Sequence, residues 1–191
     1  MKVITFSRSF PKGHPRAGEP TYFVEKILNK YFSNAGGWCN NQVEKAVANY
    51  TRIMGHINNP NHYAAKVHTV RAGNRWKAGE WFSPRVWGND INPKSGKSGP
   101  YQSKQIEFAP PIMIEKVWPI TIYPDAEHKF VIHIKDRYVA DWEGTANITQ
   151  KELAANDGLT KADFLSWFKL DKEIIKPFSG QIICWSNKIQ Y

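Results

Sequence analysis

Apolar residues recur at two spacings along the chain, and the change of spacing separates its regions. Over residues 43–57 they recur three or four positions apart, which is the spacing of one face of an α-helix. A similar stripe follows Thr21, and threonine is a common helix cap. The pattern predicts a helical hairpin over residues 21–57, with Asn40 or Asn41 as the cap of its second helix.

Alternation of apolar and polar residues predicts strands elsewhere, beginning with residues 2–6. Thr149 and Thr160 are predicted to cap two short helices, and Asp163 completes a capping-box pattern with Thr160. Residues 88–101, rich in glycine, proline and serine, are expected to form a mobile loop. The later predicted strands are residues 67–71, 80–87, 103–108, 111–122, 129–134 and 137–142, with a closing strand in 178–189.

This mixture of helices and short strands predicts an α+β domain whose strands curl into a small barrel. A chain of 191 residues, 41% hydrophobic and 23% charged, fits one domain with a hydrophobic core. No apolar run approaches the roughly 20 residues of a membrane-spanning helix, so no membrane partner is expected. Cys39 and Cys184 are far apart, which predicts a reducing cytoplasm rather than a disulfide or zinc framework.

Positive charge is concentrated in one part of the chain. The formal net charge is +9, and the segment from Lys66 to Lys104 holds eight Lys or Arg against two acids. Tryptophans at positions 76, 81 and 87 are interleaved with these cations. Lys and Arg bind phosphates while aromatic rings stack on bases, so RNA or a nucleotide is the expected partner.

Residues 81–87, taken as a strand, place alternate side chains on opposite faces. The apolar set that includes Phe82 and Val86 is the expected barrel interior. The other face carries two tryptophans on either side of Arg85, which suits base stacking beside a phosphate contact. The expected nucleic-acid-binding residues are Lys66, Arg71, Arg75, Trp76, Lys77, Arg85 and Trp87.

Several motifs are similar to those of a known family. Lys66, Thr69 and Arg71 spell K-x-x-T-x-R, and a K-x-G turn follows at residues 77–79. The opening strand ITF-x-R-x-F fits the same pattern, as does the late segment 152–168, in which an acid precedes an apolar helix. With these motifs the chain resembles the ASCH domain family of PUA-like β-barrels.

The resemblance implies a single domain over residues 1–191, with a PUA-like β-barrel of five to seven strands and flanking helices. It covers residues 1–12 and 64–191, which leaves residues 13–63 as a helical insertion. Most members of the family are expected to bind RNA or modified nucleotides in a cleft on the barrel. The resemblance therefore implies the same class of partner as the charge pattern.

One branch of the family implies catalysis. It is similar to acetylcytidine amidohydrolases, whose site consists of a Lys, a Thr and a late acidic residue, and the family also includes ribonucleases. By motif these positions are Lys66, Thr69 and Asp157, although the family has Glu at the acidic position. In such a site the Lys acts as base or nucleophile and the acid protonates the leaving amine. The Thr orients a water or holds the acyl oxygen.

Three functions therefore stay open. Binding of RNA or a nucleotide is favoured, and hydrolysis through Lys66, Thr69 and Asp157 is the alternative. A protein-binding adaptor that works through the hairpin 21–57 is the third. The histidines show no metal-ligand spacing and no glycine-rich phosphate loop is present, so neither a metal nor another cofactor is expected.

Overall fold

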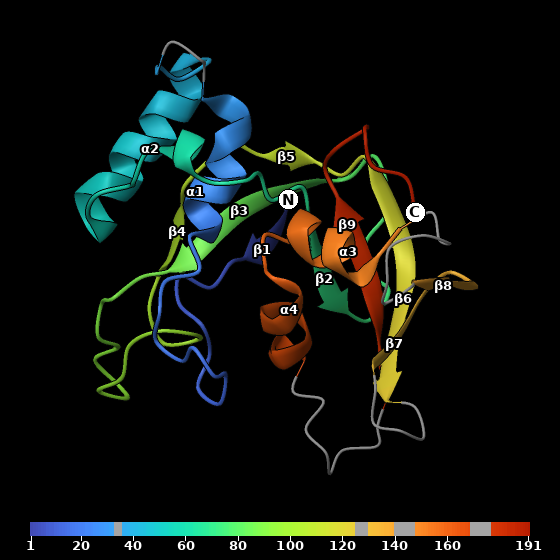
Figure 1. Ribbon diagram of the computed structural model, residues 1–191. Coiled ribbons are helices and arrows are strands. Elements are labelled where there is room, and N and C mark those ends of the chain that lie inside the picture. Colours follow the sequence, from blue (N-terminus) through green and yellow to red (C-terminus); the bar gives the residue numbers. More distant parts are fainter. Residues whose placement is uncertain (33–35, 125–129, 140–147, 169–176) are drawn as a thin grey trace. The chain divides into compact units, whose positions relative to one another are not determined.

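The computed structural model describes residues 1–32, 36–124, 130–139, 148–168 and 177–191 (Figure 1). The chain forms two compact units, each built from segments that are far apart in the sequence. The first unit contains residues 1–10, 19–65 and 81–112, and the second contains residues 11–18, 66–80 and 113–191. Most of the predicted insertion, residues 19–63, therefore belongs to the first unit, whereas residues 13–18 belong to the second.

The first unit is built on a small sheet with β3 at its centre. β1 runs parallel to β3, β4 runs antiparallel to it, and β5 also pairs with β3. The expected inward face of β3 is confirmed, because Phe82 and Val86 are completely buried. The four strands are β1 (Lys2–Thr5), β3 (Trp81–Trp87), β4 (Gln105–Glu107) and β5 (Ile112–Met113).

Aromatic rings fill the core of this unit. The Phe6 ring lies 6.0 Å from the ring of Phe108, and the Tyr50 ring of α2 (Asn41–Met54) lies 6.3 Å from Phe108 on an edge-to-face contact. Asn40 caps α2 as expected: its side-chain oxygen accepts hydrogen bonds of 3.0 Å from two backbone N–H groups of the first turn. The cap is local in sequence, whereas the position of Tyr50 depends on the core.

The first helix begins differently from the prediction. Thr21 was expected to cap it, but Tyr22 occupies the cap position with a left-handed φ of 56°. The Thr21 hydroxyl donates a hydrogen bond of 2.6 Å to the carbonyl of Ser7 and accepts a long one of 3.4 Å from the Phe23 N–H. In the first unit the described helical elements besides α2 are α1 (Phe23–Leu28) and two 3-10 turns, η1 (Asn29–Tyr31) and η2 (Pro60–His62).

The connection between β3 and β4 is crossed by hydrogen bonds at several points. The Ser103 hydroxyl donates to the Asp90 carbonyl at 2.6 Å and accepts from the Gly99 N–H at 2.7 Å. The Asp90 carboxylate accepts from the Lys104 N–H at 3.1 Å. Hydrogen bonds of short polar side chains, rather than strand pairing, thus define the path of this connection.

The second unit is built on a five-stranded antiparallel sheet with the order β2–β9–β6–β7–β8. Alternate residues of β6 point to the core, so Trp118, Ile120 and Ile122 are buried while Pro119 between them is exposed. The strands are β2 (His68–Ala72), β6 (Lys116–Pro124), β7 (Phe130–Ile134), β8 (Arg137–Val139) and β9 (Phe178–Cys184).

Two short helices accompany this sheet, α3 (Gln150–Asn156) and α4 (Lys161–Trp167), and α3 lies across one face of it (Figure 1). Thr149 caps α3 as predicted, in a reciprocal capping box with Glu152. Thr160 caps α4 as predicted, since its hydroxyl accepts a hydrogen bond of 3.1 Å from the Asp163 N–H. Both helices therefore start where the local sequence places them.

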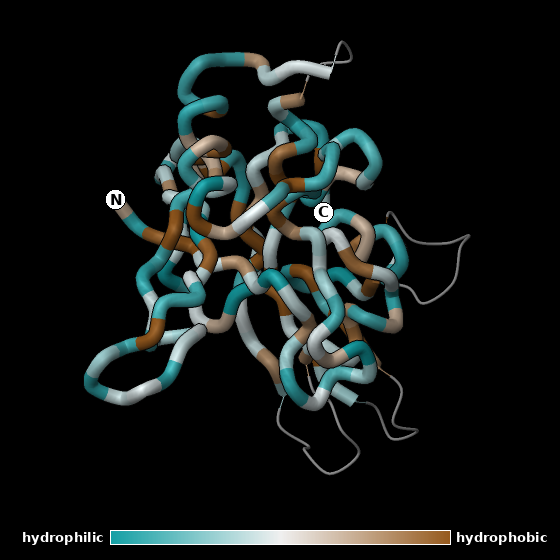
Figure 2. Tube along the Cα trace, turned by 90° about the vertical axis from the view of Figure 1, so that its left-hand side faces the viewer, coloured by the Kyte–Doolittle hydropathy of each residue, from teal (hydrophilic) through white to brown (hydrophobic). Residues whose placement is uncertain are grey.

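The α+β fold class is confirmed: nine strands in two sheets and four α-helices are present among the described residues. Within this part of the chain the strand ladders form two separate sheets and do not close into one barrel. The strand predicted over 137–142 is observed up to Val139, and residues 140–142 lie outside the described ranges. Hydrophobic and hydrophilic stretches alternate along the Cα trace (Figure 2). None of the described helices has the length and apolar character that crossing a bilayer requires.

Gly180 on β9 provides a test of the pairing between β2 and β9. A Cβ atom added there would collide with the Arg71 carbonyl oxygen and lie 2.8 Å from Phe178 Cζ. We expect Gly180→Ala to lower the free energy of unfolding by about 1–3 kcal/mol, measured by urea denaturation. Ser179→Ala, at an exposed neighbouring position, should change it by less than about 0.5 kcal/mol. Equal stability of the two variants would contradict the close approach of these strands.

Candidate active site

Lys66 lies just before β2, and its backbone is fixed by hydrogen bonds to both neighbouring elements. The Trp185 indole N–H donates to the Lys66 carbonyl at 3.1 Å, and the Trp185 backbone N–H donates to the Val67 carbonyl at 3.0 Å. The Val67 N–H in turn donates to the Asn156 carbonyl at 2.9 Å. These bonds hold Lys66 between the end of β9 and the end of α3.

Asp157 is the C-terminal cap of α3. Its backbone N–H donates to the Leu153 carbonyl at 3.1 Å, and Gly158 follows with a left-handed φ of 75°. Glycine adopts this conformation without the steric penalty of a Cβ atom, so the chain can turn away from the helix at this point. The turn leaves the Asp157 side chain next to Lys66.

Lys66 and Asp157 form a buried ion pair. Lys66 Nζ lies 2.6 Å from Asp157 Oδ1 and also donates to the carbonyl oxygen of Asp157. The two side chains are only 1% and 9% exposed, respectively. Burial raises the pKa of Asp157, whereas the charge and hydrogen bond of Lys66, the charge of Arg71 and the Val70 N–H act in the opposite direction.

Sequence reasoning missed His68 and Tyr191, which lie beside this pair. His68 is completely buried, with Nε2 3.9 Å from Asp157 Oδ1 and Nδ1 2.8 Å from the Tyr191 hydroxyl oxygen. Burial, and secondly the charge of Lys66, hold the pKa of His68 well below its usual value. The two-residue spacing from Lys66 puts His68 on the same face of an extended segment, which was its only sequence signal. Tyr191 had none.

Thr69, the third member of the predicted catalytic set, is buried on β2 opposite Ile183 of β9. In an extended strand it points to the face opposite His68. Among the described residues its hydroxyl makes no hydrogen bond to Lys66 or Asp157. The structure therefore brings two of the three predicted catalytic residues into contact.

The predicted nucleic-acid-binding residues of the second unit differ in exposure. Trp76 is buried, and Gln181 clamps its backbone by accepting from its N–H at 3.0 Å and donating to its carbonyl at 3.1 Å. The Arg75 guanidinium lies 5.2 Å from the Trp76 ring centre. Arg75 and Lys77 are exposed, and Arg71 is half-buried. In this segment Arg75 and Lys77, rather than the tryptophan, are presented to solvent.

Arg85 and Trp87 belong to the first unit. Arg85 Nε donates to the Ser83 hydroxyl at 2.9 Å, and its guanidinium lies 3.7 Å from the Glu107 carboxylate. The Trp87 ring lies 5.3 Å from the ring of Tyr101, which is 86% exposed. Sequence reasoning missed Tyr101 because it lies in the glycine-rich connection rather than in a strand. That connection carries three exposed lysines: Lys94, Lys97 and Lys104.

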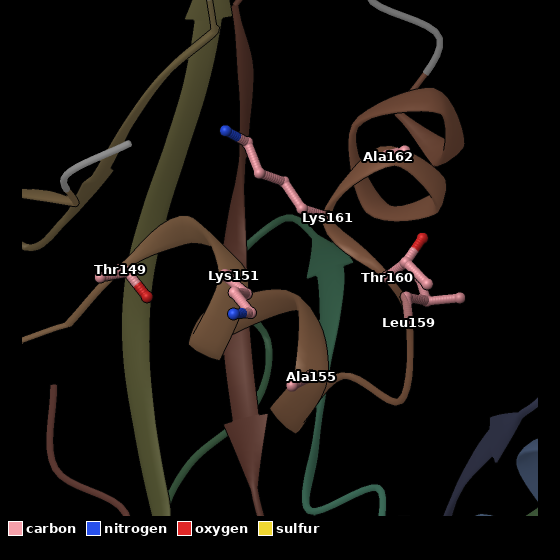
Figure 3. Close-up of a pocket in the computed structure, with 7 residues that line it drawn as sticks. All are labelled: Thr149, Lys151, Ala155, Leu159, Thr160, Lys161 and Ala162. Atoms are coloured by element: carbon pink, nitrogen blue, oxygen red, sulfur yellow. The ribbon is translucent and has the colours of Figure 1, made fainter. Parts of the chain in front are cut away.

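A hollow of about 530 Å³ lies beside α3 and α4 (Figure 3). Alanine, leucine and threonine side chains line it together with one lysine from each helix (Figure 3). Its lining residues are Thr149, Lys151, Ala155, Leu159, Thr160, Lys161 and Ala162. No residue predicted from the sequence to act in catalysis or binding is among these seven, so the hollow is distinct from the Lys66–Asp157 pair.

The chemistry of the site follows from a few ionisable groups. Within the described ranges, no group of three or more His, Cys, Asp or Glu is placed to hold a metal ion. Comparison of the chain with protein-family models, with curated proteins and with solved structures finds no match. A buried amine and a carboxylate 2.6 Å apart can exchange a proton directly, which is the basic requirement of acid–base chemistry.

The low pKa of His68 predicts a pH dependence of stability. The unfolded chain binds a proton at His68 below about pH 6.5, whereas the folded protein does so only at lower pH. The free energy of unfolding should therefore fall as the pH drops below that value, by up to about 1.4 kcal/mol per pH unit from this group. We expect urea denaturation to show a smaller loss for His68→Gln than for the wild type.

His62→Gln, at an exposed position of the first unit, is the matched control and should follow the wild type. If the wild type and His68→Gln lose stability in parallel on acidification, His68 is not held neutral in the folded protein.

Proposed function

We propose that this protein is a hydrolase of the ASCH type that removes an acyl group from an amine of a nucleoside or nucleotide. The observation that carries the proposal is the buried contact between Lys66 and Asp157, which are 2.6 Å apart although 91 positions separate them in the chain. Both residues were predicted from separate motifs. The proposal includes the PUA-like barrel expected of the family.

The energetics of the pair favour a chemical role. Burial of an amine and a carboxylate has a desolvation penalty that their attraction offsets only in part, so such pairs are weak sources of stability. Strongly perturbed ionisable groups are concentrated at functional sites. Asp157 is one methylene shorter than the Glu of the family, yet its carboxylate reaches Lys66 because the helix end brings the backbone carbonyl to the same amine.

The pair can provide both proton transfers that amide hydrolysis requires. As a water oxygen attacks the acyl carbon, its proton passes to the pair. The C–N bond then breaks and the pair returns a proton to the leaving nitrogen, so the products are a carboxylic acid and a free amine. Asp157, with the larger exposed fraction, is the partner nearer to solvent. Thr69 retains its proposed role of holding the acyl oxygen.

We also propose, as a second candidate function, that the first unit binds single-stranded RNA. The specific observation is the exposed ring of Tyr101 against Trp87, in a connection that carries exposed lysines. Bases of any sequence stack on such rings while lysines neutralise phosphates. This proposal keeps the expected partner class and Trp87, and adds Tyr101 to the predicted binding residues.

Removal of either member of the pair tests the hydrolase proposal. We expect Lys66→Met and Asp157→Asn each to lower the turnover of N-acetylated cytidine by at least about 100-fold, because proton transfer to and from the pair is lost. Released cytidine is measured by chromatography, and folding by circular dichroism. Lys188→Met, which removes an exposed lysine of the same unit, should retain turnover.

If a single variant does not fold, the double variant Lys66→Met with Asp157→Leu removes both buried charges and should fold without activity. Wild-type protein that leaves acylated cytidines intact, or a folded Lys66→Met variant with undiminished turnover, would contradict the hydrolase proposal.

Replacement of Tyr101 tests the RNA proposal. Stacking of one base on an aromatic ring contributes about 1–3 kcal/mol, so Tyr101→Ser should weaken binding of a short single-stranded RNA by about tenfold. Fluorescence anisotropy at several salt concentrations measures the affinity. Tyr138→Ser, which removes an exposed tyrosine of the second unit, serves as the control. Equal affinities of the two variants would exclude Tyr101 as a stacking residue.

A further inference from the structure

A chain of polar contacts leads from α3 back to the buried ion pair. Asn156 Nδ2 donates a hydrogen bond of 2.9 Å to the Tyr191 hydroxyl oxygen, and that oxygen lies 2.8 Å from His68 Nδ1. His68 Nε2 lies 3.9 Å from Asp157 Oδ1, the atom that accepts the hydrogen bond from Lys66 Nζ. The five residues come from three separate parts of the sequence.

One of these hydrogen bonds has a fixed direction. The amide nitrogen of Asn156 donates to the Tyr191 oxygen, which leaves the single hydrogen of the phenol available for His68 Nδ1. Burial raises the pKa of Tyr191, so the phenol keeps this hydrogen. When this hydrogen is directed to His68, Nδ1 is the acceptor, and in the neutral ring the remaining hydrogen is on Nε2.

The Nε2–H group of His68 then faces Asp157. The ring is completely buried, and Nε2 makes no hydrogen bond to any described residue, since 3.9 Å to Oδ1 is beyond hydrogen-bond length. A buried donor without a partner is unfavourable, and its nearest anionic group is the Asp157 carboxylate. If the Asp157 carboxylate moved closer to Nε2, it would accept a second hydrogen bond besides the one from Lys66.

We propose that Asn156, Tyr191 and His68 form a positioning relay that fixes His68 in the Nε2–H tautomer and directs this N–H at Asp157. The relay supports the ionised form of Asp157 and leaves Lys66 as the group that shares a proton with it. Its importance for turnover rests on the proposed hydrolase function, but its effect on Asp157 does not. His68, Tyr191 and Asn156 are positioning residues in this scheme, because they act through Asp157.

The surrounding charges agree with this assignment. Lys66 disfavours a second cation at His68, and Arg71 on β2 adds positive charge near Asp157. Cys184, opposite His68 on β9, has a pKa raised by burial and stays a neutral thiol. The titratable and charged groups that face the relay are Lys66, Arg71, Glu152, Asp157, Cys184 and Tyr191.

The experiment reads the tautomer and the carboxylate directly, by NMR. Nitrogen-15 spectra of the wild type should show hydrogen on His68 Nε2 and none on Nδ1. In Tyr191→Phe the donor to Nδ1 is lost, so the Nε2–H tautomer is no longer enforced. The Asp157 carboxyl carbon should then titrate at higher pH than in the wild type, because loss of an N–H directed at a carboxylate disfavours its charged form. Tyr138→Phe, at an exposed tyrosine of the same unit, should leave this titration unchanged.

A second variant reverses the relay. In Asn156→Asp the new carboxylate accepts the Tyr191 hydrogen, so the phenol oxygen becomes an acceptor and His68 Nδ1 should carry a hydrogen. This variant keeps the shape of the side chain, and the backbone carbonyl that binds Val67 is unaffected. Its readout is the tautomer alone, because the added charge also acts on Asp157.

Three outcomes decide between the proposals. A wild-type His68 with hydrogen on Nδ1, or an Asp157 titration that is the same in Tyr191→Phe and the wild type, would overturn the relay. If the tautomer and the titration change as expected and the wild type hydrolyses acylated cytidines, turnover in Tyr191→Phe should fall by about tenfold or more, as for other groups that orient a reacting residue. If they change as expected but no acylated nucleoside is hydrolysed, the relay stands and the hydrolase proposal fails.

Discussion

The contact between Lys66 Nζ and Asp157 Oδ1 is the constraint on which the site of the second unit depends. Both groups give up most of their hydration, so removal of either partner leaves a buried charge at a penalty of about 3–5 kcal/mol. The contact also links the segment before β2 to the end of α3. A backbone hydrogen bond from the Val67 N–H to the Asn156 carbonyl connects the same two segments. The position of His68, two residues after Lys66, follows from the same arrangement.

Burial separates the two proposed activities. Lys66 and Trp76 belong to the basic, tryptophan-rich segment, yet both are buried, so they contribute to the ion pair and to packing rather than to a surface for phosphates and bases. The exposed aromatic ring with lysines in the same connection is instead Tyr101, in the first unit. A buried ion pair suits proton transfer, and an exposed ring among cations suits a polyanionic strand. The two proposals thus rest on different residues.

Local chemistry was sufficient to predict much of the fold. Strands of alternating pattern were found close to their predicted positions, and Asn40, Thr149 and Thr160 cap helices as expected, because a cap is formed with N–H groups two or three residues away. Thr21 is the exception. Its hydroxyl bonds to the Ser7 carbonyl, a partner outside the helix, and the cap position passes to Tyr22.

By itself, the sequence determined the α+β class and the caps at Asn40, Thr149 and Thr160, because these depend on short-range patterns. Motif spacing also predicted Lys66 and Asp157 as site residues, and the two lie in contact. Tertiary structure alone decided that Lys66 and Asp157 meet across 91 positions, that Tyr191 reaches His68 across 123, and that Gln181 clamps Trp76. Such contacts follow from the register of β9 against β2 and from where α3 ends on the sheet. Periodicity indicates which face of an element is buried, but it does not indicate which distant polar group will be found there.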